Sequence, residues 1–173
     1  MLSRESELFC YYFAYGSCMC PVDLQRTLQE AVEPYIIGTA TLAGYRLGFY
    51  YYAQHRNCGA LDIVPDRDST VYGVLYRLPA RLIPALDLRE HVPQGGYRHE
   101  LVDVRCQDRH YLQVKTYVVV NKLSTEYPPN DWYAGVVIRG AATCNLPTDY
   151  RHQLHAHIQR LQQSCHPCDF AVA

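Results

Sequence analysis

Two spacings of hydrophobic residues organise the chain. Stretches rich in Tyr, Val, Leu and Ile, several with apolar and polar residues alternating, predict β-strands. The polar segment 66–69 is expected to be a turn between two of them, and Ala43-Gly44 is expected to separate another two. The predicted strands are residues 8–15, 35–42, 45–52, 59–64, 71–78, 97–105 and 111–120.

Helical spacing of apolar residues occupies the rest of the chain. Pro21 suits a first helical turn, and Leu154, Ile158 and Leu161 fall on one face of a later helix. Strands with interspersed helices predict an α+β fold, a single domain over residues 1–173 with 164–173 as a loose tail. The predicted helices are residues 20–33, 79–89, 132–139 and 148–163.

Composition narrows the function. The chain has 173 residues and 49% apolar residues, enough for one packed core and too many for a disordered chain. The formal net charge of −1 gives no basic footprint for nucleic acid. Residues 1–7 carry three charged side chains with no apolar run after them, so no secretory signal is expected and a cytoplasmic protein without membrane or nucleic-acid partners is predicted.

The cysteines and histidines are expected to hold no metal. Eight cysteines in a chain of this length, without an export signal, indicate reduced thiols. Cys165 and Cys168 have metal-ligand spacing, but the other close pair is the tight Cys18-x-Cys20. His152, His155 and His157 lie in an otherwise polar helix, where solvated side chains are usual. Neither a metal nor another cofactor is predicted.

The segment from Tyr12 to Met19 carries the strongest chemical signal. A strand-like aromatic run stops at Gly16, and a helical pattern starts at Pro21. A glycine at such a junction lets backbone N–H groups approach a ligand, and a helix start adds partial positive charge. The segment therefore predicts a binding turn for a small anion such as a carboxylate, although a plain structural turn has the same pattern.

Four sequence blocks resemble the gamma-glutamylcyclotransferase family, which includes AIG2-like proteins. They occur in the order and spacing of that family and span about Phe9 to Leu154. The blocks are Tyr12-Phe-Ala-Tyr-Gly-Ser17, Val71-Tyr-Gly-Val-Leu-Tyr76, Leu86-Asp-Leu-Arg-Glu90 with Gly95-Gly-Tyr97, and Pro128-Pro-Asn-Asp-Trp-Tyr133 followed by Gly140-Ala141 and Leu146-Pro147.

The resemblance implies a fold, a reaction and a site. The fold is a mixed β-barrel surrounded by helices, and the reaction releases a γ-glutamyl group as 5-oxoproline without a cofactor. Glu90 falls on the family's catalytic carboxylate, and Tyr133 falls on the tyrosine that follows the double proline. The anion-binding turn is matched by Tyr15, Gly16, Ser17, Cys18 and Met19.

Two positions depart from the family pattern. Cys18 stands where Asn is usual, and His91 stands where Gly often follows the catalytic Glu. Backbone donors survive the change at Cys18, so anion binding is still expected. Both departures bear on the choice of substrate more than on the reaction.

The chemistry requires one carboxyl group used twice. The substrate's own α-amine attacks its γ-carbonyl, and Glu90 is expected to remove a proton from the amine and deliver it to the leaving amine. Each candidate also has an alternative role. Glu90 could be a solvated charge at a helix end, Tyr133 and Tyr97 could be core-packing residues, and Cys18 could be a nucleophile.

The substrate class stays open at this level. A γ-glutamyl peptide or amide, a γ-glutamylamine such as an isopeptide, and a small carboxylate held by a non-catalytic binding module all fit the sequence. The leaving amine and the oligomeric state are not set by the residues.

Overall fold

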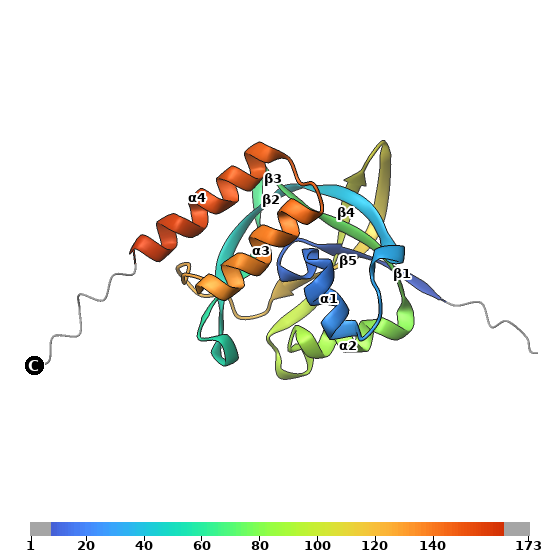
Figure 1. Ribbon diagram of the computed structural model, residues 1–173, viewed down its shortest axis with the longest axis horizontal. Helices are drawn as coiled ribbons and strands as arrows, with labels where there is room; N and C mark the ends of the chain where they lie inside the picture. The colour runs from blue at the N-terminus through green and yellow to red at the C-terminus, as the bar shows by residue number, and fades with distance from the viewer. Residues whose placement is uncertain (1–7, 165–173) are drawn as a thin grey trace, which may run out of the picture.

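The computed structural model describes residues 8–164, in which five strands close into a barrel (Figure 1). The strands follow one another around it in the order β1-β3-β2-β4-β5, and all neighbours are antiparallel except β5 and β1, which meet in parallel at Tyr12 and Lys115. Their bounds are β1 Phe9–Ala14, β2 Ile36–Ala53, β3 Cys58–Pro79, β4 Tyr97–Cys106 and β5 Arg109–Val119.

Four α-helices and several short 3-10 turns accompany the barrel. Figure 1 shows α3 beside α4 and α1 beside α2. The helices are α1 Pro21–Leu28, α2 Ile83–Arg89, α3 Asp131–Thr143 and α4 Thr148–Ser164. The α+β barrel with surrounding helices is therefore confirmed.

Strands β2 and β3 are each longer than the sequence predicts. The prediction of a turn at residues 66–69 is wrong, because β3 continues through this segment. The predicted break at Ala43-Gly44 is also wrong, because β2 continues through it. The two breaks face each other across the ladder: Ala43 pairs with Thr70 and Tyr45 pairs with Pro65. The turn signals therefore mark a bulge, which bends and twists a strand pair without ending it.

Two helices end elsewhere than predicted. Helix α1 stops at Leu28, because Gln29 adopts a left-handed conformation with φ 55°, and the expected extension to Glu33 is wrong. Helix α3 continues past Arg139 through Gly140 to Thr143. The predicted tail overlaps the described residues only at Ser164, which ends α4; residues 165–173 lie outside them.

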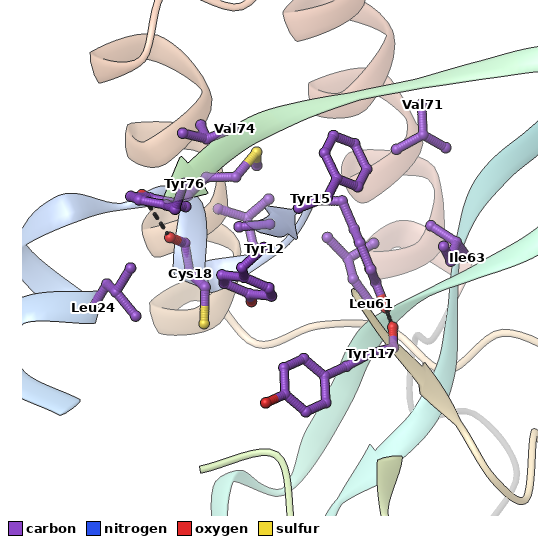
Figure 2. Packing of buried hydrophobic residues seen from close by; sticks show 14 of the residues in the cluster. Tyr12, Tyr15, Cys18, Leu24, Leu61, Ile63, Val71, Val74, Tyr76 and Tyr117 are labelled. Atoms are coloured by element: carbon purple, nitrogen blue, oxygen red, sulfur yellow. Dashed lines mark hydrogen bonds between the residues drawn. The ribbon is translucent and has the colours of Figure 1, made fainter. Parts of the chain in front are cut away.

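The core is unusually rich in tyrosine (Figure 2). Tyr12, Tyr76 and Tyr117 are almost fully buried together with Phe13 and Leu61. The rings of Tyr12 and Tyr76 stack 6.0 Å apart, and Tyr12 meets Tyr117 edge-on at 5.8 Å. Aromatic pairs of this kind add about 0.5–1.5 kcal/mol each beyond their buried area. They also bring polar hydroxyl groups into the interior.

Candidate active site

A small cavity of about 30 Å³ lies where the end of β1, the end of α2 and three other strands meet. Its lining comes from segments far apart in the sequence: Tyr12, Tyr15, Gly16, Ser17, Cys18, Leu61, Glu90, Tyr97, Tyr117 and Tyr133.

The turn after β1 presents backbone donors to this cavity. A 3-10 turn, Ser17–Met19, uses the N–H groups of Met19 and Cys20, which donate to the carbonyls of Gly16 and Ser17 at 3.0 and 3.1 Å. Within residues 8–164, the N–H groups of Ser17 and Cys18 have no backbone acceptor. These two groups are therefore available to an anion.

Gly16 shapes the turn. Its φ of −120° and ψ of −137° lie outside the helical and extended regions. A Cβ at this position would make ordinary contacts with the Tyr133 hydroxyl at 3.6 Å and with Leu61 at 3.7 Å, two residues that line the cavity.

Glu90 reaches the cavity from the C-terminal end of α2. Its N–H donates to the Leu86 carbonyl at 2.9 Å, and its carbonyl accepts from Tyr97 N–H at 3.1 Å, which fixes the backbone between helix and strand. The side chain is only 18% exposed. The Cys18 thiol donates to Glu90 Oε1 at 3.4 Å, so the turn and the carboxylate are in contact.

Burial raises the pKa of Glu90 above that of an ordinary glutamate. The Arg89 guanidinium, the Cys18 thiol, Arg56 and His91 act in the opposite direction. A carboxylate with a raised pKa holds a proton more strongly than a solvated one, which suits a group that must accept and return a proton near neutral pH.

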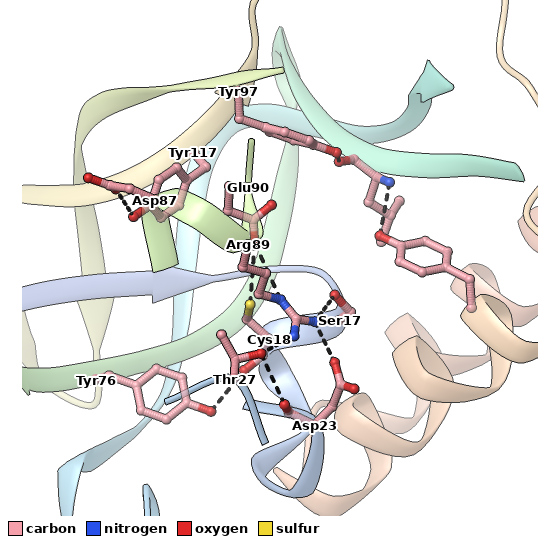
Figure 3. A network of polar contacts seen from close by, with 12 residues as sticks. Ser17, Cys18, Asp23, Thr27, Tyr76, Asp87, Arg89, Glu90, Tyr97 and Tyr117 are labelled. Atoms are coloured by element: carbon pink, nitrogen blue, oxygen red, sulfur yellow. Dashed lines mark hydrogen bonds and ion pairs between the residues drawn. The ribbon is translucent and has the colours of Figure 1, made fainter. Parts of the chain in front are cut away.

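Arg89 ties the carboxylate to the turn and to α1 (Figure 3). Its Nη2 donates to Ser17 Oγ at 2.8 Å and forms an ion pair with Asp23, while its Nη1 donates to Thr27. Its Nε lies 3.7 Å from Glu90 Oε1. The Arg89 side chain is 11% exposed, so these contacts act with little screening by solvent.

Cys18 is a neutral thiol in this setting. Burial raises its pKa to about 12, against the opposing influence of Arg89. A thiol with that pKa is almost entirely protonated at neutral pH, and only the thiolate is a strong nucleophile. The geometry therefore favours Cys18 as a hydrogen-bond donor to Glu90 and argues against nucleophilic catalysis.

Three tyrosines build the far wall. The hydroxyl groups of Tyr15 and Tyr97 donate to the carbonyls of Tyr117 and Leu61 at 2.6 and 2.8 Å (Figure 2 for Tyr15, Figure 3 for Tyr97). The Tyr133 hydroxyl instead accepts from the Leu61 N–H at 3.1 Å. Its own proton can therefore be donated into the cavity.

Most of the residues predicted from the sequence meet at this cavity. Tyr15, Gly16, Ser17, Cys18, Glu90 and Tyr133 all line it. Met19 does not: its side chain is fully buried in the core, and its N–H is used inside the turn. The cavity thus joins the turn and the carboxylate, while their roles remain predictions.

The sequence reasoning missed other parts of the site. Tyr12, Leu61 and Tyr117 line the cavity, and Arg89 braces it. Tyr97, weighed mainly as a packing residue, lines it too. Two of the missed residues had a usable signal: Tyr12 opens the first quoted block, and Arg89 directly precedes the candidate base.

A larger hollow of about 760 Å³ lies between α1 and α3, lined by Val22, Arg26, Trp132 and Arg139 among others. It contains neither Glu90 nor Ser17, and its one acid near the site, Asp23, is already paired with Arg89. Its size alone therefore does not make it the reaction site.

Within residues 8–164, no three His, Cys, Asp or Glu side chains gather as ligands for a metal ion; Cys165 and Cys168 lie outside that range. None of the helices in the same range is long and apolar enough to cross a membrane.

Comparisons with known proteins agree with this architecture. The model of the AIG2-like family matches residues 70–154. Bacillus subtilis YkqA is 33% identical over 154 residues, which cover 87% of this chain and 53% of YkqA. The crystal structure of YkqA superposes with a TM-score of 0.81 over 90% of this chain and 56% of that one. The chain thus spans about half the length of YkqA.

Proteins of similar length also match. The gamma-glutamylcyclotransferase of Mus musculus is 27% identical over 157 residues, covering 88% of this chain and 80% of the mouse protein. A solved structure described as a gamma-glutamyl cyclotransferase shares the fold, with a TM-score of 0.75 at 22% identity over 96% of this chain and 93% of that one. With its barrel and cavity, the chain is similar in sequence and in fold to gamma-glutamylcyclotransferases, and part of it matches the AIG2-like family.

Proposed function

We propose that this protein is a cyclotransferase that releases 5-oxoproline from a γ-glutamyl peptide or amide. The observation that carries the proposal is the contact between a buried carboxylate and a donor turn: Glu90 Oε1 lies 3.4 Å from the thiol of Cys18. A binding module for a small carboxylate has no use for a buried base beside its anion turn. Cyclisation requires both groups.

The reaction forms one bond and breaks one. The substrate α-amine attacks the γ-carbonyl carbon, and the bond from that carbon to the leaving nitrogen breaks. A free α-amine has a pKa of about 7.7–8.0, so most molecules must lose a proton before attack at neutral pH. Glu90 accepts that proton and returns it to the leaving amine, so one residue serves both steps.

Positioning supplies much of the rate. An intramolecular attack in the right geometry can gain roughly 7–11 kcal/mol over the reaction of free partners. The N–H groups of Ser17 and Cys18 and the Tyr133 hydroxyl are the available donors for the substrate carboxylate and the developing oxyanion. Because the cavity holds about 30 Å³, a glutamyl group has to displace side chains at its edge. The thiol of Cys18 on Glu90 is the contact we expect to open.

The cellular setting is part of the same proposal. The six cysteines among the described residues are all free, and four of them, Cys18, Cys20, Cys58 and Cys106, are buried. Unpaired thiols persist in a reducing compartment, which supports a cytoplasmic enzyme.

The test is direct. Purified protein is incubated with a panel of γ-glutamyl dipeptides and γ-glutamylamines, and 5-oxoproline is measured by mass spectrometry. We expect product from at least one member, and at least about a hundredfold less from the matched Glu90→Gln protein. Binding of a panel member without any product would support the carboxylate-binding module instead. Product from the amines alone would assign the γ-glutamylamine reaction.

A further inference from the structure

The hollow of about 760 Å³ between α1 and α3 has no role in the mechanism above, although it has the size of a ligand site. Sites for small molecules commonly enclose about 300–1,000 Å³, with a mostly apolar lining and a few polar groups. Apolar side chains reach this hollow from two helices and two strands: Val22 from α1, Ile36 from β2, Val74 from β3, and Trp132 and Val136 from α3. The hollow can therefore take the apolar part of an organic molecule.

Two of these apolar side chains are large and exposed. Val22 is 59% exposed and Trp132 is 52% exposed, whereas Val74 and Val136 are buried. The Arg56 guanidinium lies 5.4 Å from the centroid of the Trp132 ring, a cation–π contact that helps to hold the indole in place. An indole held in this way offers a flat surface for stacking at little cost in conformational entropy. The apolar part of a ligand is therefore expected to be aromatic.

The charges around the hollow favour an anion. Arg26 of α1 and Arg139 of α3 line it, and neither side chain forms an ion pair with a carboxylate among residues 8–164. Of the two acids in the lining, Asp23 is already paired with Arg89, so only Glu33 opposes the two arginines. A guanidinium binds a carboxylate or a related oxyanion through two parallel hydrogen bonds. The lining thus combines an aromatic surface with free cationic groups.

The hollow is separate from the reaction cavity but borders the groups that support it. Asp23 lines the hollow and pairs with Arg89 (Figure 3), and Cys144 lines it while its thiol donates to the Met19 carbonyl at 3.2 Å. Changes at these lining residues would disturb the turn after β1. The two unpaired arginines form no hydrogen bond or ion pair with that turn, so they are the residues to change in a test.

We propose that this hollow is a second ligand site, for an organic molecule with an aromatic body and an anionic group such as a carboxylate. The aromatic body stacks on Trp132, and the anionic group meets Arg26 or Arg139. The inference does not rest on the cyclotransferase reaction, because Glu90 and Ser17 are absent from the lining.

The test uses two fluorescent probes that share their rings and differ in charge. Anilinonaphthalene sulfonate is an aromatic anion, and phenylnaphthylamine is its neutral counterpart. The chain has one tryptophan, and it lines the hollow, so energy transfer from Trp132 reports on a probe bound there. The reaction cavity of about 30 Å³ is too small for either probe. We expect the wild type to bind one sulfonate per chain, with energy transfer from Trp132.

Variants locate the probe and separate its charge from its rings. Arg26→Gln and Arg139→Gln should each weaken the sulfonate about two- to fivefold, the range of an exposed charge contact, and leave the neutral probe unchanged. Val22→Ser, at an exposed position that the fold does not need, should weaken both probes about two- to fivefold. Arg67→Gln is the matched control: Arg67 is exposed on β3, does not line the hollow, and should leave both affinities unchanged.

Three results would overturn the proposal. The first is no binding of the sulfonate by the wild type. The second is an affinity for the sulfonate that neither arginine variant changes, or that Arg67→Gln lowers as much as they do. The third is a dimer in sedimentation whose formation excludes the probe, because a second copy of the chain would then cover the hollow. None of these results bears on the release of 5-oxoproline, which is measured separately.

Discussion

Two buried carboxylates, Glu90 and Asp62, are treated differently by this fold. Asp62 on β3 is fully buried, accepts the Val119 N–H at 3.0 Å and forms an ion pair with Lys122. Glu90 is 18% exposed, and its closest donors are a thiol at 3.4 Å and the Arg89 Nε at 3.7 Å. Burial raises the pKa of both groups.

The difference lies in the partners. Asp62 is satisfied by strong donors, so it fixes the chain after β5 to β3 and has little capacity left for a ligand. Glu90 is held by weak contacts beside a cavity, which leaves its oxygens accessible to a substrate. The comparison fits the proposed role of Glu90 as the base, because its hydrogen bonds are incomplete, and a structural role for Asp62, because its hydrogen bonds are complete.

The largest effect should come from Glu90→Gln. The change keeps the size of the side chain and removes the base, so we expect turnover to fall by about 10²–10⁴-fold, at the upper end because one group acts in two steps. Binding of a substrate-like carboxylate should persist on the turn. Turnover, ligand affinity and melting temperature are measured on one preparation. Turnover near the wild-type value would remove Glu90 from the mechanism.

The same variant should not lose stability. The folded pKa of Glu90 is raised, so its ionised form costs free energy of folding. That cost is absent below the unfolded pKa of about 4.3 and complete above the folded pKa. The melting temperature of Glu90→Gln relative to the wild type should therefore rise as the pH increases through this window.

Gly140→Ala should disturb the Glu90 region through the turn. A Cβ on Gly140 would lie 2.7 Å from Cys20 N and 3.0 Å from Met19 C, both backbone atoms that cannot rotate away. We expect a loss of about 1–3 kcal/mol in stability from overpacking. Because a small displacement of catalytic groups is costly, turnover should fall about tenfold or more.

Gly135→Ala provides the control on the same helix. A Cβ there would meet only the flexible end of Arg139, at 3.4 Å. Alanine is favoured over glycine inside a helix by about 0.5–1 kcal/mol, so this variant should be as stable as the wild type or more so. Equal behaviour of the two variants would show that the turn does not depend on the close approach of α3.

Asp62→Asn tests the other half of the comparison. It keeps an acceptor for the Val119 N–H but removes the ion pair with Lys122, whose side chain is 35% exposed and can return to water. The free energy of unfolding, measured in urea, should fall by about 1–2 kcal/mol. This lies between the loss expected for a surface ion pair and that for a buried ion pair. Turnover per folded molecule should fall far less than in Glu90→Gln. A comparable fall would make Asp62 part of the reaction.

Arg89→Gln should give the smallest but most specific effect. Arg89 opposes the rise in the pKa of Glu90, and its loss also leaves Asp23 uncompensated. Both changes raise the pKa of Glu90, so the acid limb of the kcat/KM profile should move to higher pH. Arg89→Lys, which keeps the charge, should shift it less. Arg46→Gln, which removes an ion pair with Asp66 remote from the cavity, should leave the limb in place.

Local sequence patterns were enough to predict most of the secondary structure. Runs of strand-favouring residues located β1, β4 and β5, and helical spacing located α2, α3 and α4 to within a few residues, except that α3 continues past Gly140. These patterns are local, because each reflects one face of an element turned toward the core. The quoted blocks, through their resemblance to a family, also placed Glu90 and the turn at one site.

Strand continuity and the partners of the charged side chains became visible only in the folded chain. The polar segment 66–69 has the composition of a turn, yet it continues as a strand because β2 pairs with β3 on both sides of it. Arg89 and Arg56 are ordinary charged residues in the sequence; one braces the turn and the other faces Trp132 because α2 and α3 bring them there. The reason is that partners and burial depend on contacts between residues far apart in the chain, and no local pattern records those contacts.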